Sequence, residues 1–238
     1  MSRPEHPFDD GIRHLAKKRG WTLDKYVLFV EGGHDERYLR LAARLFEREH
    51  AFLLLDEIAV NVFDGTKSDA FEHVRHLIST NFRSGDRDRD RLCRRMMVLL
   101  DDDVAGREAL DDLEQSGREF VVWHSLFPLR HRMRRGKRDL AKIEEQMTAD
   151  NASLGGLDCE IEDLLCPDLI PLLIGEELGW IRNEIERDGC THFELRTEAK
   201  SKLCKEVEKN ATLADVAKLC ELLRFIRYQL DLDIDPDP

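Results

Sequence analysis

A short apolar run that ends in three carboxylates, within residues 96–107, constrains this chain more than any other feature. Its first five residues (Met-Met-Val-Leu-Leu) have the length and composition of a buried parallel strand. In open α/β sheets, such strands present functional groups just beyond their carboxyl ends. Residues two apart in an extended chain point the same way, so we expect Asp101 and Asp103 to share a face and Asp102 to point away.

The repulsion between two carboxylates on one face must be compensated by a positive charge. At roughly 5 Å and an effective dielectric near 20, their repulsion is about 3 kcal/mol. A divalent cation between Asp101 and Asp103 would remove it, and ligation by oxygen alone favours Mg²⁺ or Mn²⁺. The alternative is an aspartate that caps the helix expected next, for which one carboxylate suffices. This stretch alone leaves both interpretations open.

A second stretch repeats the arrangement earlier in the chain. Residues 25–30 (Lys-Tyr-Val-Leu-Phe-Val) have the composition of a strand, and they lead into Glu31, two glycines, His34 and Asp35. A helical pattern follows as far as Leu45. The paired glycines permit a tight turn and the close approach of a ligand to the backbone. If both strands are central and parallel, their acidic tips come together.

These two motifs together resemble the TOPRIM domain, which is shared by topoisomerases, bacterial primases and several nucleases. The sequences are Glu-Gly-Gly-His-Asp at 31–35 and Asp-Asp-Asp-Val-Ala-Gly-Arg at 101–107. The resemblance implies an enzyme that acts on phosphodiesters with one or two Mg²⁺ or Mn²⁺ ions. It makes Glu31, Asp101 and Asp103 the catalytic and metal-binding residues. Asp35 is a further ligand or a helix cap, and we place Arg107 among the substrate-binding residues.

The order of elements predicts an α/β fold with a mainly parallel, four-stranded sheet flanked by helices, as the TOPRIM resemblance also implies. The other two strands are expected at 57–63 and 119–123. A lead-in at 1–24 precedes the TOPRIM domain at 25–167, which carries a basic insertion at about 129–142. A helical C-terminal region is expected at 168–238, with helices at about 168–188, 198–210 and 213–230.

Positive charge is concentrated in one place only. The chain carries a net charge of −12, which argues against broad coating of nucleic acid. The basic insertion is therefore the candidate for phosphate contact, through Arg132, Arg134 and Arg135. Lys67, just beyond the strand at 57–63, is a further candidate. The alternatives are a solvated or partner-facing helix for the insertion and a solvated helix-start position for Lys67.

An acidic segment at 160–165, Glu-Ile-Glu-Asp-Leu-Leu, resembles one that follows the core strands in TOPRIM nucleases of the OLD type (overcoming lysogenisation defect). By this resemblance Glu162 joins the metal site, with Glu160 a less favoured contributor. The alternative is an exposed acidic face that caps a helix. OLD-type proteins also have a lysine in a later helix, for which Lys200 or Lys202 is the counterpart.

The absences narrow the class of enzyme. Only three tyrosines occur, none in an added strand-cleaving domain, which disfavours a topoisomerase. Neither the zinc module of a primase nor a Gly-x-x-x-x-Gly-Lys-Ser/Thr ATPase motif is present. We therefore expect a free-standing TOPRIM nuclease that cleaves DNA or RNA. By analogy with antiphage defence effectors, a separate ATPase would be its partner. The alternatives are an RNA-processing nuclease and a non-catalytic binding module.

Composition supports a cytoplasmic protein. No stretch approaches the roughly 20 apolar residues of a membrane span, and the first ten residues hold no signal-peptide core. The six cysteines are scattered without a Cys-x-x-Cys pair, which favours reduced thiols and argues against zinc. The oligomeric state stays open.

Overall fold

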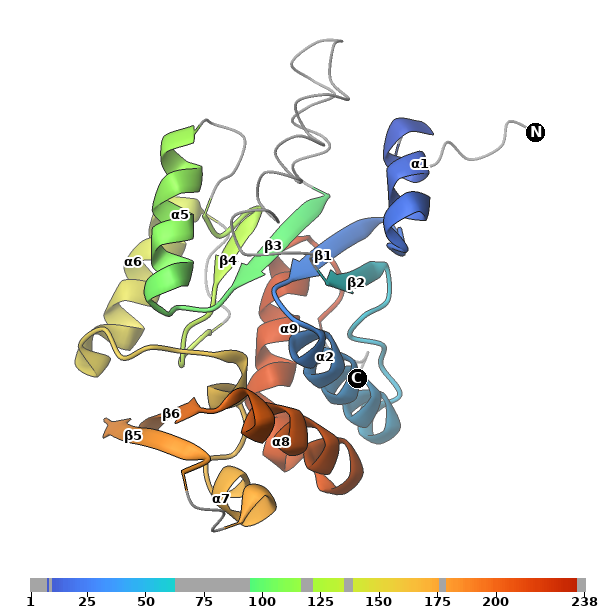
Figure 1. The fold of residues 1–238 in the computed structure, drawn as a ribbon. Helices are drawn as coiled ribbons and strands as arrows, with labels where there is room; N and C mark the ends of the chain where they lie inside the picture. Colours follow the sequence, from blue (N-terminus) through green and yellow to red (C-terminus); the bar gives the residue numbers. More distant parts are fainter. Residues whose placement is uncertain are drawn as a thin grey trace.

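The computed structural model describes residues 8, 10–62, 95–116, 122–134, 139–175 and 179–234 of the chain. These residues form an α/β protein with seven α-helices around a four-stranded, all-parallel sheet, as Figure 1 shows. The sheet has the order β2-β1-β3-β4. Its strands are β1 (Tyr26–Val30), β2 (Ile58–Val62), β3 (Met96–Leu100) and β4 (Leu126–Pro128). The expected α/β class and parallel sheet are confirmed.

The two strands that carry the acidic motifs are neighbours at the centre of this sheet. β1 pairs with β3 in parallel, with Val27 opposite Met96 and Phe29 opposite Val98. All five residues of β3 are buried, because helices cover both faces of the sheet. The carboxyl ends of β1 and β3 therefore lie at the same edge.

Alternate residues of β1 face two different hydrophobic clusters, as the two-residue period of a strand requires. Val27 and Phe29 join a smaller cluster with α1 (Asp10–Arg19) and α5 (Val104–Ser116). Leu28 and Val30 belong to the large core, which includes residues of α2 (Gly33–His50) and α9 (Ala217–Gln229). The helix α1 lies in a stretch that the sequence suggested only as a polar lead-in.

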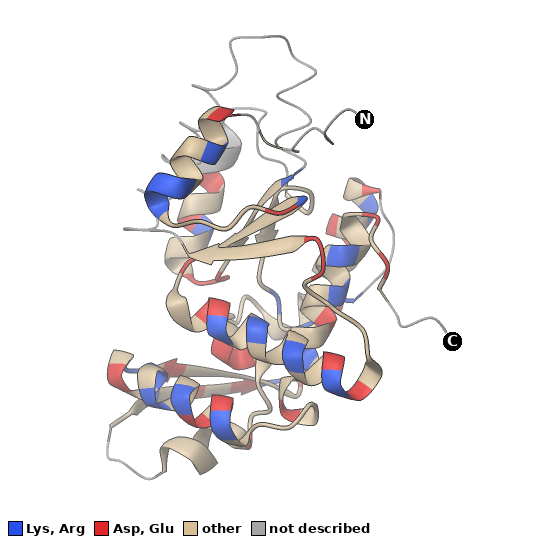
Figure 2. Ribbon diagram, turned by 90° about the vertical axis from the view of Figure 1, so that its right-hand side faces the viewer, with Lys and Arg blue, Asp and Glu red and all other residues tan. Residues whose placement is uncertain are grey.

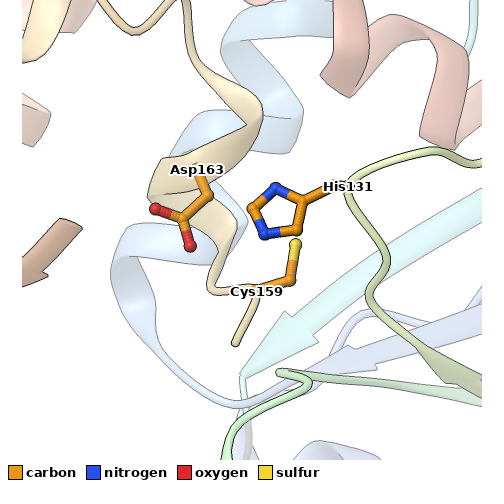
Figure 3. A group of neighbouring side chains, drawn as sticks. All are labelled: His131, Cys159 and Asp163. Atoms are coloured by element: carbon orange, nitrogen blue, oxygen red, sulfur yellow. The ribbon is translucent and has the colours of Figure 1, made fainter. Parts of the chain in front are cut away.

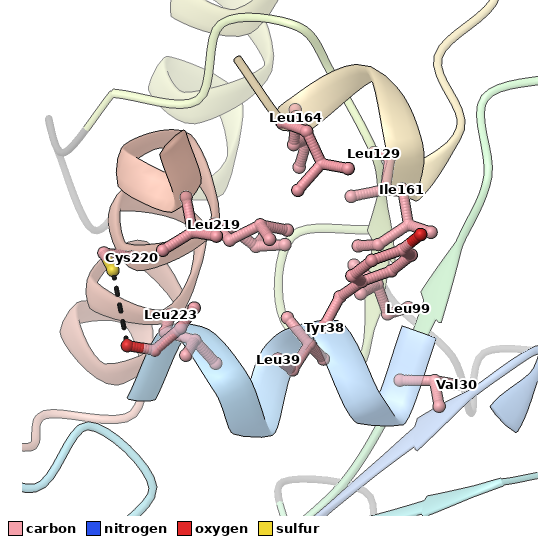
Figure 4. Packing of buried hydrophobic residues seen from close by; sticks show 14 of the residues in the cluster. Val30, Tyr38, Leu39, Leu99, Leu129, Ile161, Leu164, Leu219, Cys220 and Leu223 are labelled. Carbon is pink, nitrogen blue, oxygen red and sulfur yellow. Dashed lines mark hydrogen bonds between the residues drawn. The ribbon is translucent and has the colours of Figure 1, made fainter. Parts of the chain in front are cut away.

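The large core joins the beginning of the chain to its end. Tyr38 and Leu39 of α2 pack near Leu219 and Leu223 of α9, as Figure 4 shows. The thiol of Cys220 donates to a backbone carbonyl of α2 over 3.6 Å, the contact drawn dashed there. Full burial of one leucine contributes about 1.5–3 kcal/mol. The last helix is therefore part of the core under the sheet.

Of the remaining elements, the hairpin, α7 and α8 lie below the sheet in Figure 1, whereas α6 lies beside α5. Two strands form an antiparallel hairpin beside several helices and 3₁₀ turns. In chain order they are α6 (Leu140–Asn151), η1 (Ala152–Leu154), η2 (Ile161–Leu164), α7 (Leu169–Ile174), β5 (Ile181–Arg187), β6 (Cys190–Leu195), α8 (Thr197–Asn210) and η3 (Ala214–Val216). The helices expected at 198–210 and 213–230 are thus confirmed, apart from a 3₁₀ start to the second.

The long helix expected at 168–188 is wrong. Helix α7 ends at Ile174, and Gly175 follows with φ +68°. The chain from 181 onward forms the hairpin instead. Asp188 and Gly189 both have positive φ at its tip, 48° and 72°, as a two-residue type I′ turn requires.

The fourth strand is also displaced from its expected position at 119–123. Of that segment the structure describes Val122, which makes an isolated bridge to Leu126, and Trp123, which turns with φ +63°. Strand β4 begins after this turn, so His124 precedes the strand instead of ending it. The helix expected after β2 lies outside the described residues.

Charge is mixed over most helices. In Figure 2, Lys and Arg positions are interspersed with Asp and Glu positions along the helices. Within the described ranges, no helix has the length and apolar character needed to cross a membrane.

Candidate metal centre

The acidic tips of β1 and β3 lie together, as the two motifs predicted. Glu31 directly follows β1 and Asp101 directly follows β3. The backbone N–H of Asp101 donates to Oε1 of Glu31 at 3.0 Å. This hydrogen bond fixes the Glu31 carboxylate against the neighbouring strand end.

Three carboxylates converge at this edge of the sheet. Asp101, Asp103 and Glu160 each offer one oxygen, and these oxygens all lie within 4.8 Å of one another. All three residues are half-buried, so their mutual repulsion is screened less than it would be in bulk water. They form a group of oxygen donors of the kind that binds a hard divalent cation.

Asp103 also caps the helix that follows it. Its Oδ1 accepts the backbone N–H of Gly106 at 2.6 Å, at the beginning of α5. A Cβ atom at position 106 would lie 1.8 Å from the Asp101 carbonyl oxygen, so this tight turn requires glycine. The metal-binding and helix-capping interpretations of Asp103 are therefore compatible.

A backbone bridge brings Glu160 to the strand tips. Asp102 and Cys159 form an isolated antiparallel bridge, with N–H to carbonyl distances of 2.9 and 3.1 Å. The Asp102 side chain points away from the group formed by Asp101, Asp103 and Glu160, and it pairs with Arg107 and Arg130. This divergence agrees with the alternation expected for the strand end.

A buried cluster holds the 3₁₀ turn η2, which presents the acidic segment. Asp163 accepts hydrogen bonds from the backbone N–H groups of Glu160 and Phe193, at 2.8 and 3.0 Å, and pairs with His192 Nδ1 at 2.8 Å. The hydrogen bond from His192 to Asp163 raises the pKa of that imidazole. Asp163 thereby ties η2 to the hairpin strand β6.

Figure 3 shows Asp163 beside His131 and Cys159, a second group whose ligand atoms lie within 4.8 Å of one another. All three are buried. Burial raises the pKa of the Cys159 thiol and lowers that of His131, so both are neutral at pH 7. Nε2 of His131 donates to the Asp158 carbonyl at 2.8 Å. The donor types would suit a transition metal, but the existing hydrogen bonds already give Asp163 and His131 a structural role.

Lys200 enters the candidate site from α8. Its ammonium lies 2.7 Å from Oε2 of Glu160 and 3.5 Å from Oε2 of Glu162. Burial disfavours the charged lysine, but the two glutamates outweigh this and raise its pKa above the ordinary value. Lys200, which the resemblance suggested, is thus placed beside the carboxylates, whereas Lys202 lies over the ring of Trp180.

Glu162 is almost completely buried, with 2% of its surface exposed. Burial raises its pKa to about 7, against the opposing effect of Lys200, and Asp35 and Glu160 raise it further. The convergent group of three contains Glu160 and not Glu162. Of these two glutamates, the one that the sequence favoured less is the one that meets Asp101 and Asp103.

Asp35 serves the turn between β1 and α2. Its Oδ2 accepts the backbone N–H of Gly32 at 2.8 Å, in the first turn of the helix. This is the capping alternative that the sequence left open beside metal ligation. Next to it, Nε2 of His34 lies 3.4 Å from the Ser201 hydroxyl, which joins the starts of α2 and α8.

Two of the basic candidates make contacts within the protein. Arg107 binds the Asp102 carbonyl at 2.8 Å and Oδ1 of Asp158 at 2.7 Å. Arg132 binds Asp188 Oδ2, at 2.7 Å, at the tip of the hairpin. Arg134 is exposed. Two candidates, Lys67 and Arg135, lie outside the described residues.

Fold and site together define an α/β protein with a carboxylate group at the carboxyl edge of a parallel sheet, where such folds bind ligands. No protein-family model, curated protein or solved structure matches the chain.

Proposed function

We propose that the protein is a Mg²⁺- or Mn²⁺-dependent nuclease of the TOPRIM type, which hydrolyses phosphodiester bonds in DNA or RNA. The observation that carries this proposal is the convergence of Asp101, Asp103 and Glu160, with Glu31 hydrogen-bonded to the same strand tip. The two sequence motifs that resemble TOPRIM proteins supply the acidic residues that directly follow β1 and β3. The order of strands β1 and β3 at the sheet centre supports the same assignment.

The donor set fits a hard cation, because every ligand offered is a carboxylate oxygen. Asp101, Asp103 and Glu160 would hold the metal. A bound Mg²⁺ or Mn²⁺ supplies positive charge to the phosphate oxygens and lowers the pKa of a water molecule.

The chain's own residues then have separate tasks. Glu31 is held by the Asp101 N–H and acts either as a further ligand or as the general acid or base. Lys200 offsets part of the negative charge of Glu160 and Glu162 and keeps both side chains in place. Its ammonium also offers a positive charge for the phosphate that undergoes attack.

The test is cleavage of single-stranded and duplex DNA and RNA with Mg²⁺ or Mn²⁺, using substitutions that preserve the fold. Glu31→Gln keeps a side-chain oxygen for the Asp101 N–H, whereas Glu31→Ala leaves that donor unpaired at a cost of about 1–3 kcal/mol. We expect Glu31→Gln, Asp101→Asn and Glu160→Gln each to abolish cleavage. Circular dichroism should show unchanged folding.

Asp111, an exposed residue on α5, provides the matched control. Asp111→Asn removes one negative charge without touching the carboxylate group and should cleave like the unaltered protein. Calorimetric titration with Mn²⁺ should show binding that Asp101→Asn weakens. Retention of cleavage by Asp101→Asn would contradict the proposal, and metal binding without cleavage of any substrate would favour a binding module.

A further inference from the structure

A cleft of about 460 Å³ is lined in part by Asp102, the residue at the β3 tip that pairs with Arg107 and Arg130 and is not in the carboxylate group. Its described lining comes from the β3 tip and α5, from the chain on both sides of β4, from α6, and from η1 and the turn that follows it. Its volume lies within the range of sites that bind small molecules and cofactors. None of its described lining residues belongs to the proposed metal group.

One wall of the cleft is apolar. Trp123, Met147 and Leu157 contribute to it, and each is buried. The indole N–H of Trp123 donates to the carboxylate of Glu144 on α6, which fixes the orientation of the ring. Such a surface suits the flat, weakly polar face of a nucleobase.

The other wall is charged and holds two arginines, whose charges are met by Asp102 and, for Arg107, also by Asp158. Arg107 and Arg130 both pair with Asp102, and all three line the cleft. Their side chains keep 39% and 25% of their surface exposed, compared with 11% for Asp102. Guanidinium groups have five N–H donors each, so both retain donors for a phosphate while they hold the aspartate.

The cleft adjoins the proposed site of cleavage. Asp102 stands between Asp101 and Asp103, and consecutive Cα atoms are ~3.8 Å apart. A strand whose scissile phosphate meets Asp101 and Asp103 therefore brings a neighbouring nucleotide within reach of this wall.

We propose that the cleft receives one unstacked nucleotide of the substrate strand, with its base against the apolar wall and its phosphate on Arg107 and Arg130. This inference rests on the proposed nuclease function and gives it a substrate class. A nucleotide enters such a cleft only if it is single-stranded or flipped out of a duplex. The substrate is then a single-stranded or looped region of nucleic acid.

The test separates binding from cleavage. Asp101→Asn, which is expected not to cleave, keeps the cleft and is titrated with nucleoside 5′-monophosphates by calorimetry. Thr148 lines the cleft from an exposed position on α6, and Thr148→Glu places a negative charge there. The matched control is Ala149→Glu, which adds the same charge at the next exposed residue, outside the described lining.

We expect Thr148→Glu to weaken mononucleotide binding about tenfold relative to Ala149→Glu, and to raise KM for a single-stranded substrate by a similar factor. The unaltered protein should cleave single strands in preference to a perfect duplex. Equal binding by the two glutamate variants, or equal cleavage of duplex and single strand, overturns the inference. If the protein binds mononucleotides, Thr148→Glu removes this binding and no substrate is cleaved, then the cleft is a nucleotide-binding site and the proposed nuclease function is wrong.

Discussion

Replacement of Glu162 by glutamine should stabilise the protein, and the gain should depend on pH. The pKa of this carboxyl rises from its ordinary 4.5 to about 7, mainly because it is buried. A difference of one unit between the pKa values of the folded and the unfolded chain corresponds to about 1.36 kcal/mol. Ionised Glu162 therefore costs the folded state about 3 kcal/mol, even with Lys200 nearby. Glutamine resembles the neutral acid and avoids this cost.

The pH dependence of this stability difference follows from the protonation of Glu162 in the folded and the unfolded chain. Below pH 4.5 the carboxyl is protonated in both the folded and the unfolded chain, so wild type and Glu162→Gln should differ little. Between pH 4.5 and 7 only the folded protein keeps the proton, so the stability of the wild type falls as the pH rises. Above pH 7 the variant should be more stable by about 3 kcal/mol.

Urea unfolding of both proteins at several pH values between 5 and 8 measures this difference. Glu145→Gln is the control, since this residue is exposed on α6 and a surface change of this kind shifts stability by less than about 0.5 kcal/mol. A difference that stays constant across the pH range, or that grows toward low pH, would refute the reasoning.

Two further predictions concern the residues that shape the site. Gly106→Ala should destabilise the fold by about 1–3 kcal/mol and weaken Mn²⁺ binding, because the new Cβ meets the Asp101 carbonyl. Gly33→Ala, where a Cβ meets nothing within 4 Å, should change neither the stability nor the Mn²⁺ affinity. Urea unfolding and Mn²⁺ titration of the two variants measure these effects. Asp163→Asn should lower the free energy of unfolding by about 1–3 kcal/mol for each buried donor that it leaves unpaired, such as the Phe193 N–H. Unfolding curves that overlay those of the wild type would contradict this prediction.

The centre of the fold could be predicted because its signals are local. The apolar runs at β1 and β3 end in acidic residues, and the parallel sheet follows from the alternation of strands and helices. Glu31 and Asp101 then lie close together whenever the two strands are neighbours, as the hydrogen bond between them shows. The proximity of these two strand-end residues could therefore be predicted from one sequence.

The hairpin was missed although it carried a signal. The apolar residues of 181–185 also fit a helical period, whereas the Asp188-Gly189 pair marks a type I′ turn. Glu160 and Glu162 could not be ranked, because their positions depend on distant contacts. The bridge from Cys159 to Asp102 and the hydrogen bonds of Asp163 decide which carboxylate reaches the strand tips.

The bridge between Asp102 and Cys159 has a consequence for the order in which the site matures during synthesis. Glu31 leaves the ribosome first and the two aspartates after β3 follow. Glu160 comes more than fifty residues later, and Lys200 arrives last, on α8. A nascent chain can therefore gather the negative charge before it has Lys200 to offset it.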